Sequence, residues 1–245
     1  MIGNKGVYDK YEIQLTENIA KPNYVFSVGK CGSSPKGDII AIKAKPKSGK
    51  TMLAILFTAV ILGADSKDVK SANPQDSKVL YFDTEQNKAN VQALMGKIHT
   101  ILGWDMLNCD RLHVYYMREM EMTERWQYIE NKTAHHKPTA IFIDGVADLI
   151  ADFNDIGSSQ EIIQKMMTLS SSYDCAVFFI LHVNKTDSNM KGHLGTLATQ
   201  KCSDVFCVDK QKDGSFKVTE TDCRNRPVDS FTFRVSEDGI PFLIG

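Results

Sequence analysis

The sequence predicts an α/β fold in which helices flank a mostly parallel sheet and antiparallel strands follow at the C-terminal end. Short, continuous apolar runs alternate along the chain with segments of helical periodicity, and such runs are typical of strands buried on both faces. Beyond Val205 the pattern changes to alternating apolar and polar residues, as in antiparallel strands with one solvated face. The 245 residues suffice for one large α/β domain or two small ones.

The alternation defines the elements in order. We predict helices over 50–63, 87–102, 123–136 and 159–173, with Thr123 as an N-cap of the third, and a loop over 65–78. The predicted strands of the parallel sheet are 39–42, 79–83, 112–116, 140–144 and 176–181. Residues 206–210, 216–222 and 230–235 alternate, and Asp213 with Gly214 is typical of a hairpin turn. We expect residues 1–36, which are polar and turn-rich, to be an N-terminal lead-in segment packing on a domain formed by 37–245.

Composition excludes some classes of function. The net charge is -1, so a single copy has no overall field that attracts nucleic acid or an anionic membrane. The six cysteines form no C-x-x-C pair and indicate reduced thiols in a cytoplasmic protein. The N-terminus lacks the apolar core of a signal peptide, and the apolar run from Met52 is too short to span a bilayer. We therefore expect a cytoplasmic protein with no membrane partner.

The stretch AKPKSGKT, residues 44–51, is similar to the phosphate-binding pattern G-x-x-x-x-G-K-[ST], with Ala44 at the first glycine. That position needs a small residue to leave the strand, and alanine is tolerated while φ stays negative. An apolar strand precedes the stretch and an apolar helix follows it, so its backbone N–H groups would form an anion cradle. The sequence thus predicts a working loop.

Within this loop the predicted nucleotide-binding residues form one continuous run. They are Lys47, Ser48, Gly49, Lys50 and Thr51. Gly49 lets the backbone approach phosphate closely, Lys50 would reach the β- and γ-phosphates of ATP, and the Thr51 hydroxyl would bind Mg²⁺.

Three later strand ends carry polar residues. Glu85 follows strand 79–83 and could orient a water that attacks the γ-phosphate, although an ordinary surface acid or helix cap is the alternative. Asp144 ends strand 140–144 after four apolar residues, a Walker B pattern that would hold Mg²⁺. His182 follows strand 176–181 and could bond the γ-phosphate, unless local backbone satisfies it. Ligand sites of open α/β sheets lie at these carboxyl ends.

With these motifs in this order, the chain resembles the RecA-like P-loop ATPases. That resemblance implies a RecA-like core, ATP and Mg²⁺ as cofactors, and hydrolysis. It makes Glu85 the catalytic glutamate, Asp144 the Walker B acid for Mg²⁺, and His182 the polar sensor. The resemblance also makes Lys50 a catalytic residue.

Within that superfamily, the stretch KPKSGK and the tail TDCRNRP are similar to plasmid RepA and DnaB-type hexameric replicative helicases. The resemblance implies a homo-oligomeric ring, a hexamer, in which Arg224 reaches a neighbouring subunit's γ-phosphate as an arginine finger. Asp222 stands where that pattern has lysine, which leaves the contact open, and Arg226 is a second candidate. An exposed basic turn is the other interpretation of this tail.

In such a ring, two loops face the central channel. The first, residues 151–160, is acidic and has no basic residue. The second, residues 184–196, carries Lys185, Lys191 and His193 and would track single-stranded DNA, or else is a solvent loop that closes over nucleotide.

These observations predict an ATP-hydrolysing motor, a helicase-type protein on single-stranded DNA in plasmid or mobile-element replication. The alternative is a RecA-fold regulatory or partner-binding ATPase that does not unwind DNA. A kinase is disfavoured, because no arginine cluster lies between Asp144 and Asp209 to form a lid.

Overall fold

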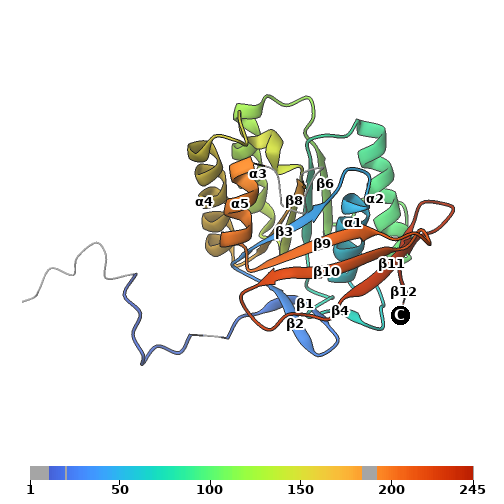
Figure 1. Cartoon of the computed structure of the whole chain (residues 1–245), viewed down its shortest axis with the longest axis horizontal. Helices are drawn as coiled ribbons and strands as arrows, with labels where there is room; N and C mark the ends of the chain where they lie inside the picture. The colour runs from blue at the N-terminus through green and yellow to red at the C-terminus, as the bar shows by residue number, and fades with distance from the viewer. Residues whose placement is uncertain (1–10, 20, 184–191, 245) are drawn as a thin grey trace, which may run out of the picture.

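The computed structural model describes residues 11–19, 21–183 and 192–244. Its centre is a nine-stranded sheet in the order β12-β11-β10-β9-β3-β8-β7-β5-β6, with helices on both faces (Figure 1). The sheet strands are β3 (Ile39–Ala44), β5 (Val79–Asp83), β6 (Leu112–Tyr116), β7 (Ala140–Asp144), β8 (Ala176–His182), β9 (Asp204–Lys210), β10 (Phe216–Cys223), β11 (Phe231–Val235) and β12 (Pro241–Ile244). The helices are α1 (Lys50–Ile61), α2 (Lys88–Leu102), α3 (Met122–His136), α4 (Ile156–Tyr173) and α5 (Gly192–Lys201), with a short 3-10 helix η2 (Val146–Leu149).

The predicted fold class is confirmed. Strands β9, β3, β8, β7, β5 and β6 are parallel neighbours, and β10, β11 and β12 continue the sheet in antiparallel order. In the parallel part, Ala44 lies opposite His182, and Asp83 lies opposite Asp144. The carboxyl ends of these strands therefore meet at one edge of the sheet.

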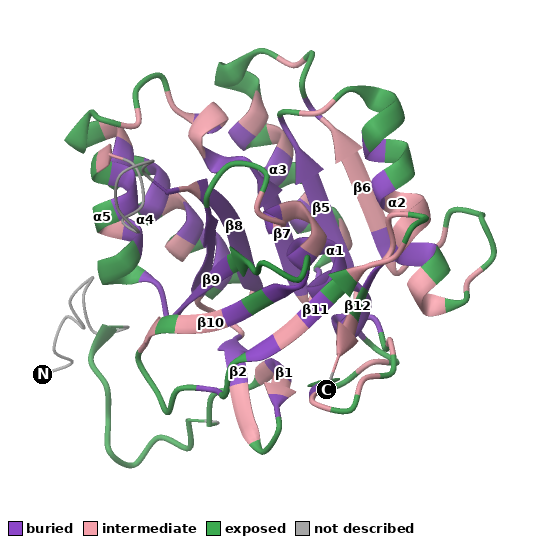
Figure 2. Ribbon diagram, turned by 45° about the vertical axis from the view of Figure 1, so that its right-hand side comes forward, coloured by how far each residue is buried: buried purple, intermediate pink, exposed green. Residues whose placement is uncertain are grey.

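Two apolar cores hold the sheet between its helices. On one face, Ile40 and Ile42 of β3 pack with α1 and α2, and Phe57 contacts Phe26 with ring centroids 4.7 Å apart. On the other face, Ile39 and Ala41 pack with residues of α3, α4 and α5. Alternate residues of one strand thus enter opposite cores, which explains its unbroken apolar run. Figure 2 shows the buried strands and the exposed outer sides of the helices.

The N-terminal part contains a second, smaller sheet. Strands β1 (Tyr24–Val28) and β2 (Cys31–Pro35) form an antiparallel hairpin, and β4 (Val69–Ser71) pairs with the other side of β1. The prediction of a loop over 65–78 was wrong at these three residues. Three residues are too few to show a periodic pattern of apolar side chains, and their strand conformation depends on pairing with β1. Ahead of the hairpin, residues 11–19 form an exposed N-terminal arm.

Several predicted boundaries differ from the structure. Helix α3 begins at Met122, and its N-cap residue is Glu121, so Thr123 is not the cap. Helix α4 begins at Ile156 rather than 159, since the Asp155 carboxylate accepts the Ser158 N–H and caps it. Helix α5 begins at Gly192, which shortens the predicted loop over 184–196. Among the described residues, no helix is long and apolar enough to cross a membrane.

Strands β9 and β10 carry two neighbouring carboxyl groups, Asp204 and Glu220. Glu220 of β10 accepts the Val228 N–H at 2.7 Å, and Asp204 of β9 accepts the Ser34 N–H at 2.7 Å. Burial, followed by the neighbouring charge of Asp204, raises the pKa of Glu220 from 4.5 to about 7. The charge of Asp204 opposes the ionisation of Glu220, so Glu220 holds its proton more tightly than an isolated glutamate does.

Replacing Glu220→Gln should flatten the pH dependence of stability. The folded chain holds the Glu220 proton more tightly than the unfolded chain does, so the free energy of unfolding should fall as pH rises from about 4.5 to about 7. Urea unfolding at several pH values measures this slope. Glu237→Gln, at an exposed position, is the matched control and should keep the wild-type slope. An equal slope in wild type and Glu220→Gln would contradict the raised pKa of Glu220.

Candidate active site

The loop between β3 and α1 has the geometry of a phosphate cradle. Ala44 is the last residue of β3, so it has the extended backbone that tolerates alanine. Two residues of the loop have positive φ, Lys47 at 60° and Gly49 at 88°, and Gly49 directly precedes the first turn of α1. The loop thus presents its backbone at the N-terminus of a helix, where N–H groups and the helix dipole favour an anion.

The Phe216 ring on β10 leaves no room for a side chain at position 49. A Cβ atom at this position would lie 2.7 Å from Cδ1 of Phe216 on β10. Phe216 in turn stacks on Phe233 of β11, with ring centroids 4.9 Å apart. The antiparallel strands therefore support the loop from behind, a contact that the glycine pattern alone does not reveal.

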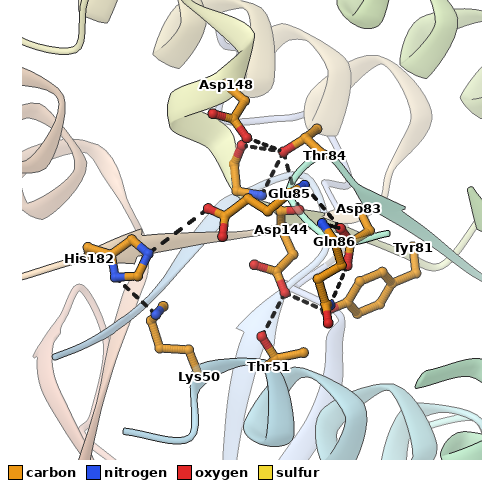
Figure 3. Close-up of polar contacts among 11 residues, drawn as sticks. Lys50, Thr51, Tyr81, Asp83, Thr84, Glu85, Gln86, Asp144, Asp148 and His182 are labelled. Carbon is orange, nitrogen blue, oxygen red and sulfur yellow. Dashed lines mark hydrogen bonds and ion pairs between the residues drawn. The ribbon is translucent and has the colours of Figure 1, made fainter. Parts of the chain in front are cut away.

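A line of polar contacts runs from the loop to the neighbouring strand ends (Figure 3). The Lys50 Nζ lies 3.1 Å from Nδ1 of His182, and Nε2 of His182 lies 4.0 Å from Oε1 of Glu85. The Lys50 ammonium can only donate, so Nδ1 accepts and neutral His182 carries its proton on Nε2, toward Glu85. The structure thus brings together three residues predicted separately from α1, β8 and the turn after β5.

Asp144 faces the first turn of α1. Its Oδ2 accepts hydrogen bonds from the Thr51 hydroxyl at 2.9 Å and from the Tyr81 hydroxyl at 3.0 Å. Only 5% of Asp144 is exposed. Burial first, and then the negative charge of Asp83, raises its pKa to about 7, although the Thr51 bond opposes the rise.

These two residues could hold a divalent cation. The Thr51 hydroxyl and the Asp144 carboxylate supply the hard oxygen ligands that Mg²⁺ prefers. A cation beside Asp144 would also favour its ionised form and offset the cost of burying the carboxylate. The donor set therefore fits the metal that the sequence predicts.

The turn after β5 fixes the position of Glu85. Asp83 accepts the backbone N–H groups of Glu85 and Gln86 at 3.1 and 2.8 Å, and the Gln86 side-chain amide at 2.6 Å. The Thr84 N–H donates to the Asp144 carbonyl at 2.8 Å. This ties the turn after β5 to the end of β7.

Gly145 leaves the space that the Glu85 side chain occupies. A Cβ atom on residue 145 would lie 2.5 Å from Oε1 of Glu85. Burial, followed by the charge of Asp148, raises the pKa of Glu85, whereas Lys50 lowers it. A raised pKa makes the carboxylate a stronger base. Burial also lowers the pKa of Lys50, against the charges of Asp144 and Glu85.

The sequence motifs do not include the residues that support this centre. Asp83 and Tyr81 are fully buried on β5, and Thr84 joins the Asp148 carboxylate at 2.9 Å. Asp83 could have been found, because it ends a buried strand as Asp144 does. A tyrosine inside an apolar strand also indicates a hydroxyl that needs a partner. The Thr84 contact has no such indication, since it depends on the register of β5 against β7.

Arg224 does not join this centre within its own chain. It follows β10, its N–H donates to the Ser203 carbonyl, and its guanidinium donates to the Lys201 carbonyl at 2.6 Å and lies 3.9 Å from Asp38. Asp38 precedes β3, whereas the phosphate loop follows it, so the length of the strand, roughly 20 Å, separates them. Arg226 is exposed in the same turn.

The predicted DNA contacts are described only in part. Lys185 and Lys191 lie outside the described residues. His193 is exposed in the first turn of α5. The Leu194 N–H donates to the Phe153 carbonyl at 3.3 Å, so the start of α5 lies against the predicted first loop.

Comparisons with known proteins agree with this geometry. A family model described as AAA domain matches residues 16–188, more than two thirds of the chain. Curated proteins include no match to the sequence. Among solved structures, a KaiC-like protein from the hyperthermophilic archaeon Pyrococcus horikoshii OT3 superposes with a TM-score of 0.62. It covers 92% of this chain and 99% of its own, at 12% identity, which shows likeness of fold. The chain therefore belongs to the AAA domain family, and it is a P-loop ATPase domain with the predicted RecA-like fold.

Proposed function

We propose that the chain is an ATP-hydrolysing motor that acts on single-stranded DNA, a helicase-type protein of plasmid or mobile-element replication. The main support for hydrolysis is the line of contacts from Lys50 through His182 to Glu85. The Thr51–Asp144 pair lies beside it. A motor needs an element that responds to the γ-phosphate. His182 is suited to that role because it contacts both the phosphate-loop lysine and the proposed catalytic glutamate.

The proposed chemistry assigns each group one task. Backbone N–H groups of Lys47 to Thr51 bind the phosphates, and Lys50 turns from His182 to the γ-phosphate. Glu85 orients the attacking water and takes its proton. Thr51 and Asp144 would hold Mg²⁺, whose charge would offset that of the phosphates. His182 donates a hydrogen bond from its Nε2–H to the phosphate that is released.

The site is completed by a second copy in a homo-oligomeric ring, proposed as a hexamer. Arg224 supplies its guanidinium to a neighbour's γ-phosphate, since its place at the far end of β3 excludes action in its own chain. Breaking the hydrogen bond to the Lys201 carbonyl would free it for this contact. We also propose a cytoplasmic protein, with residues 37–245 as the ATPase domain and 1–36 as an N-terminal lead-in that packs on it through β1.

The DNA contact is proposed for Lys185, Lys191 and His193, repeated around the ring. The start of α5 contacts Phe153, which lines the same pocket as His182, so phosphate release and this segment can be coupled. The alternative is a regulatory or partner-binding ATPase without unwinding. It is favoured by the net charge of -1 and by Asp152 and Asp155 in the first loop.

Single-stranded DNA should stimulate ATP turnover several-fold at low salt, and added salt should remove the stimulation. Steady-state phosphate release with and without single-stranded DNA, alongside strand displacement, measures this effect. The His193→Ala variant should reduce the stimulation, whereas exposed Thr199→Ala, further along α5, serves as the control. Turnover that DNA leaves unchanged, together with nucleotide-dependent binding to a protein, would favour the alternative.

A further inference from the structure

The turn that carries Glu85 is held from two sides (Figure 3). On one side, the Asp83 carboxylate accepts the N–H groups of Glu85 and Gln86. On the other side, Thr84 binds the end of β7 and the 3-10 helix η2 that follows it. Thr84 directly precedes Glu85, so a contact that fixes Thr84 also fixes the backbone from which the Glu85 side chain starts.

The Thr84 hydroxyl has one proton to donate and three acceptors within reach. Its Oγ1 lies 2.9 Å from Oδ2 of Asp148, 3.0 Å from the Gly145 carbonyl oxygen and 3.3 Å from the Asp144 carbonyl oxygen. The carboxylate is the closest of the three and the strongest acceptor, because an ionised partner shortens and strengthens a hydrogen bond. The same hydroxyl oxygen accepts the Gly145 N–H at 3.0 Å. Thr84 therefore joins Asp148 to the strand end beside Glu85.

Asp148 is itself fixed by the surrounding structure. Its N–H donates to the Gly145 carbonyl at 3.2 Å, and its carbonyl accepts a hydrogen bond from the Arg125 guanidinium of α3 at 2.8 Å. Thr84 is only 3% exposed, so water competes little for its hydroxyl. Removing one member of such a buried pair leaves the other without a partner, which costs more than the bond itself contributes.

We propose that Thr84 and Asp148 are positioning residues for hydrolysis, because their hydrogen bond holds the Glu85 carboxylate where it can orient the attacking water. Neither side chain is assigned a contact with substrate, so their effect passes through Glu85. A displacement of about 1 Å in a catalytic group can lower the rate about a hundredfold. This inference rests on the proposed ATP hydrolysis and on Glu85 as its base.

Two single variants and their combination test the bond. Thr84→Val keeps the shape of the side chain and loses the hydroxyl, whereas Asp148→Ala loses the acceptor. In steady-state phosphate release, both should lower kcat about 10- to 100-fold and leave KM for ATP within about twofold, because the phosphate loop is unchanged. The double variant should be no slower than the slower single variant, since each change breaks the same bond.

Two further variants serve as controls. Thr84→Ser keeps the hydroxyl and should retain most of the turnover. Asp238→Ala makes the same chemical change as Asp148→Ala at an exposed position before β12 and should behave as wild type. Urea unfolding of each variant establishes that the protein assayed is folded.

Hydrogen exchange gives a second readout that needs no nucleotide. The amide protons of residues 84–86 are bonded to the Asp144 carbonyl and the Asp83 carboxylate. We expect these protons to exchange about tenfold faster in Thr84→Val and in Asp148→Ala, because the turn opens more often once its second anchor is lost. Thr84→Ser should keep the wild-type exchange rate.

The contrary results are distinct. Full turnover or unchanged exchange in Thr84→Val would overturn the inference, and so would a double variant whose loss equals the product of the two single losses. The proposed function fails separately. If the wild-type chain released no phosphate, hydrolysis would be refuted, whereas faster exchange in Thr84→Val and Asp148→Ala would still show that their bond holds the turn.

Discussion

Replacing Glu85→Gln should lower the rate of ATP hydrolysis about 10³-fold while ATP binding stays near the wild-type value. The amide keeps the size and polarity of the side chain above Gly145 but cannot take a proton from water. Asp83 still shapes the turn through its bonds to the backbone of residues 85 and 86, so the fold should not change. Single-turnover hydrolysis and equilibrium ATP binding separate these two effects.

The exposed Glu130 of α3 provides a matched control, since Glu130→Gln makes the same chemical change far from the site. Normal turnover by Glu85→Gln would show that another group activates the water. Asp83 would then be the next candidate, because it lies at the same strand end as a buried carboxyl group.

Arg224→Ala should lower ATP turnover of the assembled protein about 10³-fold, because its guanidinium is proposed to enter the neighbour's site. Arg226→Ala, in the same turn, is the comparison that decides between the two arginines. The variant should still bind ATP, since Arg224 lies at the opposite end of β3 from its own phosphate loop.

Mixing two inactive variants tests the action of Arg224 between copies more directly. Subunits with Lys50→Ala keep Arg224, and subunits with Arg224→Ala keep Lys50. A mixed assembly therefore contains some interfaces with both groups intact, and its turnover should exceed that of either variant alone. Two inactive variants that stay inactive when mixed, in assemblies shown to exchange subunits, would contradict action between copies.

The sequence predicted the elements whose patterns are local. The buried strands ending at Asp83 and Asp144 are uniformly apolar, and both were predicted with the boundaries that the structure shows. Glu85, Asp144 and His182 were found because parallel strands end at one edge, so their order along the chain gives their proximity in space.

The features that were missed depend on partners far away in the sequence. Strand β4 has only three residues and forms by pairing with β1. The support of Gly49 by Phe216 and the bond from Tyr81 to Asp144 require the finished sheet. The sequence predicts a loop at the start of α5, because Gly192 and Gly195 favour flexibility, whereas in the structure Leu194 packs into the core and the segment is helical from Gly192.

Phosphate release from ATP by wild type and by Lys50→Ala, measured with Mg²⁺ over a range of protein concentrations, tests the central claim most directly. We expect multiple turnovers by the wild-type chain and a loss of tight binding or turnover in Lys50→Ala, because the Lys50 side chain lies 3.1 Å from His182 and would reach the γ-phosphate. Lys47→Ala, at an exposed loop position, should retain far more activity. A wild-type chain that releases no phosphate, with or without single-stranded DNA, or a Lys50→Ala variant as active as wild type, would contradict it.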